Sequence, residues 1–142
     1  MNVHEACGWV YNGSYNFIKN EISEPHIIIS LCDREQIFAP IVSEKTVITA
    51  ALWIGDIDVD EDNPSAFNEQ RSSVLANMIS DVYDSGVRYF RIHCMAGMSR
   101  SAGIAAALLR YFGEIEEEKK VWEQKTPQKT MYELFLKSLN EL

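Results

Sequence analysis

Features typical of secreted and membrane proteins are scarce in this sequence of 142 residues. It has three cysteines, at positions 7, 32 and 94, an odd number and too few for a disulfide-stabilised fold. No apolar run approaches the ~20 residues of a membrane span. The first residues also lack the charged and apolar regions of a secretion signal. We therefore expect a cytoplasmic protein that has no membrane partner.

Basic side chains are also scarce. The 13 lysines and arginines face 21 acidic residues, which gives a net charge of −8. Without a basic stripe the chain is not expected to bind nucleic acid, and its negative charge disfavours docking on anionic lipids. Repeats and low-complexity linkers are missing as well. With 46% apolar and 24% charged residues, the composition predicts a single globular domain over residues 1–142, expected to be a monomer.

Predicted strands and helices alternate along the chain. Apolar, β-branched runs predict strands at 26–31, 46–54 and 87–93. The remaining predictions are a short strand at 9–11, helices at 15–22, 101–112 and 115–124, a long helix from Asn63-Pro64-Ser65 to Gly86, and a last helix capped by Thr126-Pro127. This alternation predicts an α/β fold with a mainly parallel central sheet and helices on both faces. Ligands of such folds bind beyond the carboxyl ends of the strands.

The segment 92–103 joins the strand at 87–93 to the following helix through a tight loop. Backbone N–H groups in such a loop can converge on one centre, and the helix N-terminus adds a favourable field for an anion. Gly97 supplies permissive dihedrals, and Arg100 can hold two oxygens of a phosphate in its planar fork. The residues expected to bind the phosphate are Met95, Ala96, Gly97, Met98, Ser99 and Arg100.

Cys94 lies at the start of this loop, where the helix N-terminus and Arg100 both favour a thiolate. A thiolate below a bound phosphate is a nucleophile directed at phosphorus, so a phosphocysteine intermediate is expected. Ser101 can donate a hydrogen bond to the sulfur and ease its departure when water attacks. We expect His93 to orient the loop rather than to act as a base, because the nucleophile is already deprotonated.

The run His93-Cys94-x5-Arg100-Ser101 resembles the signature of cysteine-dependent protein phosphatases. Its form, His-Cys-x-Ala-Gly-x-Ser-Arg-Ser, is most similar to the compact dual-specificity and tyrosine phosphatases, and a weaker similarity extends over most of the chain. The resemblance implies the dual-specificity-phosphatase fold and hydrolysis of phosphotyrosine in a protein or peptide, without a metal or other cofactor. A chain this short implies a shallow pocket, so phosphoserine and phosphothreonine stay open as substrates.

Enzymes of this family need a carboxyl group that protonates the leaving oxygen. The loop after the strand at 46–54 carries five acidic side chains, at Asp56, Asp58, Asp60, Glu61 and Asp62. The strand ending Leu52-Trp53-Ile54-Gly55-Asp56 resembles that of the compact members, so the resemblance favours Asp56, with Asp58 and Asp62 as alternates. A calcium loop is a poor alternative, because Glu61 and Phe67 stand where glycine and glutamate are needed. No metal site is expected either at His4-x2-Cys7, where no second ligand pair follows.

Cys32 follows the strand at 26–31 directly, in a loop that is expected to lie beside Cys94. Some relatives carry a cysteine at a similar place that forms a disulfide with the nucleophile. This implies that Cys32 can trap oxidised Cys94 as a reversible disulfide. The alternative is a small buried residue at a strand end.

The sequence leaves other functions open. Met95 and Met98 replace basic residues of the phosphoinositide phosphatases, which disfavours an inositol lipid, and RNA 5′-phosphatases would need similar basic support. A phosphopeptide-binding pseudophosphatase is the main alternative from another class. Sulfur transferases and arsenate reductases also use Cys-x5-Arg, but the position and ending of the motif here fit them poorly.

Overall fold

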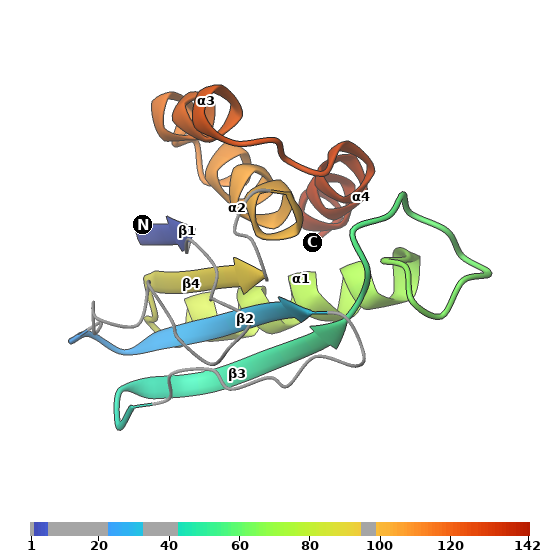
Figure 1. Ribbon diagram of the computed structural model, residues 1–142. Helices are drawn as coiled ribbons and strands as arrows, with labels where there is room; N and C mark the ends of the chain where they lie inside the picture. Colours follow the sequence, from blue (N-terminus) through green and yellow to red (C-terminus); the bar gives the residue numbers. More distant parts are fainter. Residues whose placement is uncertain (1, 6–22, 33–42, 95–98) are drawn as a thin grey trace, which may run out of the picture.

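The computed structural model describes residues 2–5, 23–32, 43–94 and 99–142. Its strands are β1 (Asn2–Glu5), β2 (His26–Cys32), β3 (Thr46–Trp53) and β4 (Tyr89–Cys94). They form one four-stranded sheet in the order β1-β4-β2-β3, in which every pairing is parallel. The helices are α1 (Glu69–Asp84), α2 (Arg100–Tyr111), α3 (Ile115–Gln124) and α4 (Lys129–Asn140) (Figure 1). The prediction of an α/β fold with a parallel sheet is therefore confirmed.

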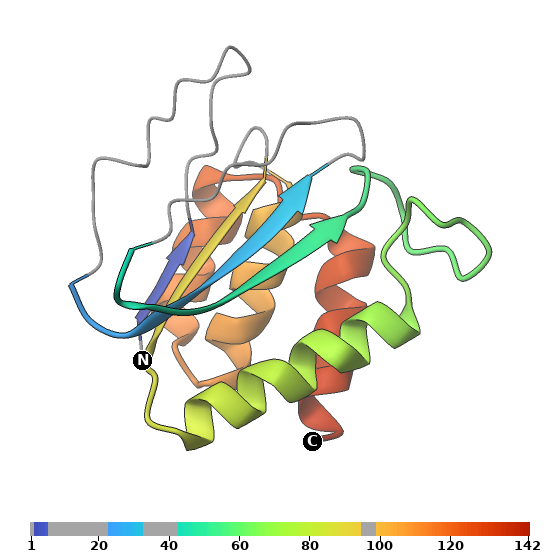
Figure 2. The ribbon, with the colours of Figure 1, turned by 90° about the horizontal axis from the view of Figure 1, so that it is seen from below.

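The core lies between the sheet and the described helices. β2 is buried along its whole length, and its register pairs Ile27 with Phe90 and Ile29 with Ile92 of β4. Because side chains alternate across a strand, these four residues share one face, where they join the core with buried positions of α1, α2 and α4. Seen from below, the strands lie in front of α2, α3 and α4 (Figure 2). The predicted strand at 9–11 and helix at 15–22 lie outside the described residues.

Strand β1 was not predicted. It pairs with β4 through Val3 and Phe90, at the opposite side of the sheet from β3. Its four residues contain one apolar side chain, so they form no apolar run from which a strand could be read. The pairing with β4 places this short segment in the sheet.

The predicted start of the long helix at Asn63-Pro64-Ser65 is wrong, because α1 begins at Glu69. The carboxamide oxygen of Asn63 accepts from the Ser65 N–H at 2.9 Å and so closes a local turn instead of capping the helix. Asn68 is the true cap, since its side chain accepts from the Arg71 N–H at 2.9 Å. The helix ends as predicted before Gly86, which has a φ of 104° that favours glycine.

The cap of α4 also differs from the prediction at Thr126-Pro127. Gln128 caps the helix, and its side-chain oxygen accepts from the Met131 N–H at 3.0 Å. Val74 of α1 is 64% exposed, although its neighbour Leu75 is buried. Among the helices of the described residues, none combines the length and apolar character needed to cross a membrane.

Candidate active site at the start of helix α2

Cys94 is the last residue of β4 and is almost fully buried, opposite Leu31 of the neighbouring strand. Its Sγ lies 3.3 Å from the hydroxyl oxygen of Ser101, which is buried in the first turn of α2. A strand end and a helix start therefore bring the thiol and the hydroxyl into hydrogen-bonding contact. This is the contact that the sequence predicted for a hydroxyl supporting the sulfur.

Ser99 and Arg100 link the start of α2 to the segment that follows β3. Ser99 is the N-cap of α2, but its side chain makes no bond to the helix; the hydroxyl instead donates to Oδ1 of Asp56 at 2.7 Å. The Nη1 of Arg100 donates to the carbonyl of Ile54 at 2.7 Å, and the arginine is buried. Both bonds join the segment that follows β3 to the start of α2. The predicted phosphate-binding residues Met95, Ala96, Gly97 and Met98 lie outside the described residues.

His93 is fully buried next to Cys94, on the other face of β4. Its Nε2 is hydrogen-bonded to the hydroxyl of Ser30, its register partner on β2. Burial, together with the positive charge of Arg91, lowers the pKa of His93 to about 3. The imidazole is therefore neutral at pH 7 and suited to a supporting role next to the nucleophile.

The three candidate acids have different surroundings. Asp56 contacts Ser99, as described above. The Oδ1 of Asp58 lies 3.3 Å from Nε2 of Gln128 and 3.4 Å from the hydroxyl of Thr130, so it is bound to the start of α4. Asp62 is exposed, and its N–H donates to Oδ1 of Asp60 at 2.9 Å in a surface turn. Of the three, Asp56 is thus the one bound to the residue that begins α2.

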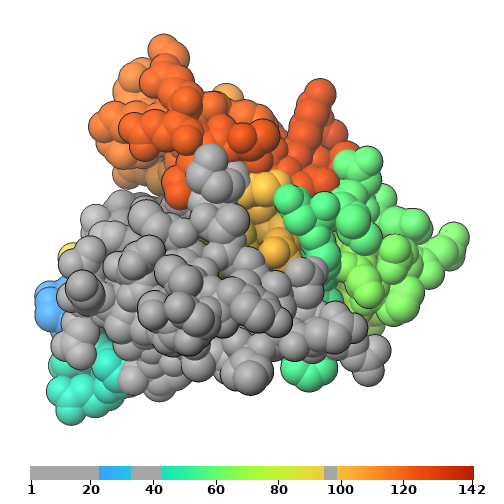
Figure 3. All heavy atoms as spheres, viewed as in Figure 1, coloured from blue at the N-terminus to red at the C-terminus, as the bar shows by residue number. Residues whose placement is uncertain are grey.

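We call residues 55–68, between β3 and α1, the acid loop. In Figure 3 its green atoms are at the surface beside the yellow-orange start of α2. The arrangement combines a buried thiol, a hydroxyl on its sulfur, a guanidinium and a carboxylate at one helix N-terminus. Such a set can attack an electrophile, support developing negative charge and transfer a proton.

Comparison with known proteins gives a likeness to solved structures. No protein-family model and no curated protein matches the chain. A solved structure described as "Crystal structure of Tk-PTP in the active form" is similar, with a TM-score of 0.49 and 16% sequence identity. The similarity covers 83% of this chain and 80% of that chain. At this level the likeness assigns no role to any residue.

Sequence reasoning missed three residues next to the site: Gln128, Thr130 and Gly103. The N–H of Gln128 donates to the carbonyl of Ser99 at 2.9 Å, which joins the start of α4 to the start of α2. A Cβ at Gly103 would come within 2.9 Å of the Gln128 carbonyl oxygen, so the contact requires glycine. A glycine inside an otherwise strong helical run was the available signal for this close approach. No pattern in the sequence pointed to Gln128 or Thr130.

Cys32 lies on β2, fully buried and paired with Trp53. It is one residue beyond Leu31, the register partner of Cys94, so strand alternation directs the two cysteine side chains to opposite faces. Cys7 lies outside the described residues. Among the residues that the structure describes, no three His, Cys, Asp or Glu side chains are placed to share a metal ion.

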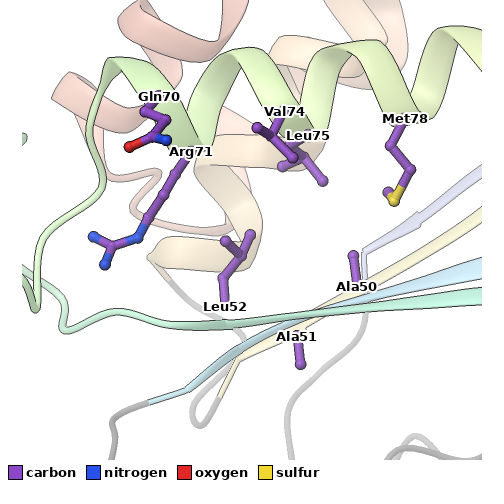
Figure 4. A pocket seen from close by; sticks show the side chains of 8 residues that line it. All are labelled: Ala50, Ala51, Leu52, Gln70, Arg71, Val74, Leu75 and Met78. Carbon is purple, nitrogen blue, oxygen red and sulfur yellow. The ribbon is translucent and has the colours of Figure 1, made fainter.

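A separate groove of about 300 Å³ lies between β3 and α1 and holds none of the predicted site residues. Ala50 and Leu52 point from β3 toward α1, whereas Ala51 points away (Figure 4). Val74, Leu75 and Met78 line the helix side. Arg71 is at one end of the groove, where Nη2 donates to the Pro64 carbonyl at 2.9 Å and Nη1 to that of Ala66. The arginine therefore supports the return of the acid loop into α1.

Proposed function

We propose that this protein is a metal-independent phosphatase that hydrolyses phosphotyrosine in proteins or peptides through a phosphocysteine intermediate. The proposal rests on two contacts at the start of α2. The thiol of Cys94 contacts the hydroxyl of Ser101, and the carboxylate of Asp56 contacts the hydroxyl of Ser99. Nucleophile, leaving-group support and proton donor thereby belong to one helix N-terminus, where a phosphate is favoured electrostatically.

In the first step the Cys94 thiolate attacks phosphorus, and the bond between phosphorus and the phenolic oxygen breaks. The protonated carboxyl of Asp56 gives its proton to that oxygen, so tyrosine leaves neutral. Arg100 and the backbone amides of residues 95–100 are proposed to hold the phosphoryl oxygens, which carry the charge of the transition state.

In the second step the Asp56 carboxylate takes a proton from water, and the water oxygen attacks phosphorus. The sulfur–phosphorus bond breaks, inorganic phosphate is released, and the thiolate returns. The hydroxyl of Ser101 donates a hydrogen bond to the departing sulfur. The distance of 3.3 Å between this hydroxyl oxygen and Sγ supports the proposed role. His93, neutral and bound to Ser30, holds the end of β4 in place.

Phosphotyrosine is favoured over smaller phosphorylated side chains by the apolar surface near Asp56. Ile57 follows Asp56 and is 39% exposed, and Trp53 at the end of β3 is 54% exposed. Such side chains can pack against a phenyl ring. Phosphoserine and phosphothreonine lack this ring and are proposed as slower substrates.

Hydrolysis of p-nitrophenyl phosphate and of a phosphotyrosine peptide, without added metal, tests the proposal. Cys94→Ser and vanadate should each abolish both activities. Asp56→Asn should slow hydrolysis of the peptide by roughly 10²–10⁴-fold, the usual size of a general-acid contribution. Hydrolysis of p-nitrophenyl phosphate should be slowed less, because nitrophenolate leaves easily without a proton. Activity that survives Cys94→Ser would overturn the phosphocysteine route. Phosphopeptide binding without hydrolysis would instead establish a phosphopeptide-binding protein.

A further inference from the structure

Hydrogen bonds also join the acid loop to the first turn of α4. The Val59 N–H donates to Oγ1 of Thr130 at 2.9 Å. The Asp58 carboxylate accepts from Nε2 of Gln128 at 3.3 Å, and the same oxygen lies 3.4 Å from the hydroxyl oxygen of Thr130. The acid loop is therefore bound to the start of α4 through the backbone of Val59 and through the side chain of Asp58.

From these contacts we infer that Asp58 and Thr130 form a latch that positions the acid loop, so that Asp58 is a positioning residue and Asp56 the proton donor. The inference rests on the proposed function. It assigns the two neighbouring aspartates different roles, one in proton transfer and one in holding the loop.

The latch is fixed to the same helix start that Asp56 contacts. Gln128 donates its N–H to the carbonyl of Ser99 at 2.9 Å, while the hydroxyl of Ser99 donates to Asp56 at 2.7 Å. Ser99 is thus bonded to Asp56 by its side chain and to Gln128 by its carbonyl, and Gln128 is bonded in turn to Asp58. Because the loop is bonded at both Asp56 and Asp58, its position and its direction between these two residues are set.

Thr130 is the centre of the latch. Its Oγ1 accepts from Val59 and lies 2.9 Å from the side-chain oxygen of Gln128, to which it donates. The amide of Gln128 can then donate to Asp58, so each polar group has a complementary partner. Loss of the Thr130 hydroxyl removes the acceptor for the Val59 N–H and one of the two donors to the side-chain oxygen of Gln128, which still accepts from the Met131 N–H.

Other bonds shape the acid loop without attaching it to α2 or α4. The Gly55 N–H donates to the Ser65 carbonyl at 2.7 Å, and the Asp60 N–H to the Phe67 carbonyl at 3.3 Å. The Glu61 carboxylate accepts from the Glu69 N–H at 2.9 Å in the first turn of α1. These bonds preserve the form of the loop when the latch is opened, so its removal changes where Asp56 lies rather than unfolding the segment. Small displacements of a reacting group can lower the rate strongly.

The test depends on what Asp58 must supply. A latch needs only an acceptor oxygen, which asparagine retains, whereas a proton donor needs the acid. We expect Asp58→Asn to keep kcat on a phosphotyrosine peptide within about threefold of wild type, and Asp58→Ala and Thr130→Val to lower it about tenfold, the effect of losing ordinary hydrogen bonds. On p-nitrophenyl phosphate all three variants should stay near wild type. Thr126→Val, at an exposed threonine before the helix, is the matched control.

A comparable loss in Asp58→Asn and Asp58→Ala would overturn the inference and make Asp58 the acid. Equal loss on both substrates would also overturn it, because the latch would then support the nucleophile instead. Hydrogen exchange at the Val59 amide provides a readout that needs no catalysis: it should accelerate in Thr130→Val and not in Thr126→Val. If the wild-type protein hydrolyses neither substrate, the proposed function fails, while exchange still decides whether the latch exists.

Discussion

The hydroxyl of Ser99 donates to the carboxylate of Asp56 at 2.7 Å, across 43 residues of sequence. The bond connects the residue that begins α2 to the loop that follows β3. Because the Ser99 side chain makes no capping bond to α2, it is available to hold the candidate acid.

Replacement of Ser99 by alanine should impair proton donation without unfolding the helix. We expect kcat on a phosphotyrosine peptide to fall about threefold to tenfold, the usual cost of one hydrogen bond, while urea unfolding stays near wild type. Ser99→Thr retains the hydroxyl and should keep most of the activity. Wild-type turnover of the peptide by Ser99→Ala would show that the contact does not position Asp56.

Replacement of Ser101 by alanine should slow the breakdown of the intermediate, because the hydroxyl 3.3 Å from Sγ supports the departing sulfur. Rapid mixing with p-nitrophenyl phosphate should then show a burst of nitrophenolate equal to the enzyme concentration. The burst should be followed by a steady rate about tenfold lower than that of wild type. A slower reaction without a burst would place the effect of Ser101 on the first step instead.

Replacement of Gly103 by alanine should destabilise the fold, although the same change inside an ordinary helix stabilises by about 1 kcal/mol. The new Cβ would lie 2.9 Å from the Gln128 carbonyl oxygen, so α2 and the start of α4 must separate. We expect urea unfolding to show a net loss of about 1–3 kcal/mol, as in other overpacked cores. A gain in the free energy of unfolding would contradict the close contact.

The buried His93 should make stability depend on pH. Its pKa of about 3 in the folded state lies below the value near 6.5 of an unfolded chain, so between these values the unfolded state binds more protons. The contribution is complete well above pH 6.5 and is lost as the pH falls toward 3, by about 2 kcal/mol between pH 8 and 5. Urea unfolding of the wild type and of His93→Gln at several pH values measures it. An equal pH dependence in both proteins would rule this contribution out.

Oxidation should join Cys32 to Cys94. Peroxide converts the Cys94 thiolate to a sulfenic acid, and the Cys32 thiol then attacks that sulfur and releases water to form the disulfide. The two residues end neighbouring strands, but their side chains lie on opposite faces, so the bond requires a rotation at the strand ends. Mass spectrometry after mild peroxide should detect the linked peptides, and Cys32→Ser should show sulfinic acid at Cys94. Overoxidised Cys94 in the wild type without the link would refute the prediction.

The sequence alone determined the central strands and the local chemistry of the candidate site. The β-branched run of β2 and the apolar approach to Cys94 are local patterns, as is the spacing from Cys94 to Arg100 and Ser101. One strand, one loop and one helix turn carry these residues, so their proximity follows from chain connectivity. The helix from Ile115 to Gln124 was likewise predicted at its observed bounds.

Tertiary structure decided the rest. Asp56, Asp58 and Asp62 lie in one acidic run of the sequence. In the structure Asp56 contacts Ser99, Asp58 contacts the start of α4, and Asp62 lies in an exposed turn. These different surroundings arise only when distant segments of the chain pack together. The observed start of α1 differs from the predicted one for the same reason. Asn63 and Asn68 are both residues that favour the N-cap position of a helix, and the bonds of the acid loop determine which of them caps α1. Hydrogen bonds between residues far apart in the chain depend on packing, which no local pattern records.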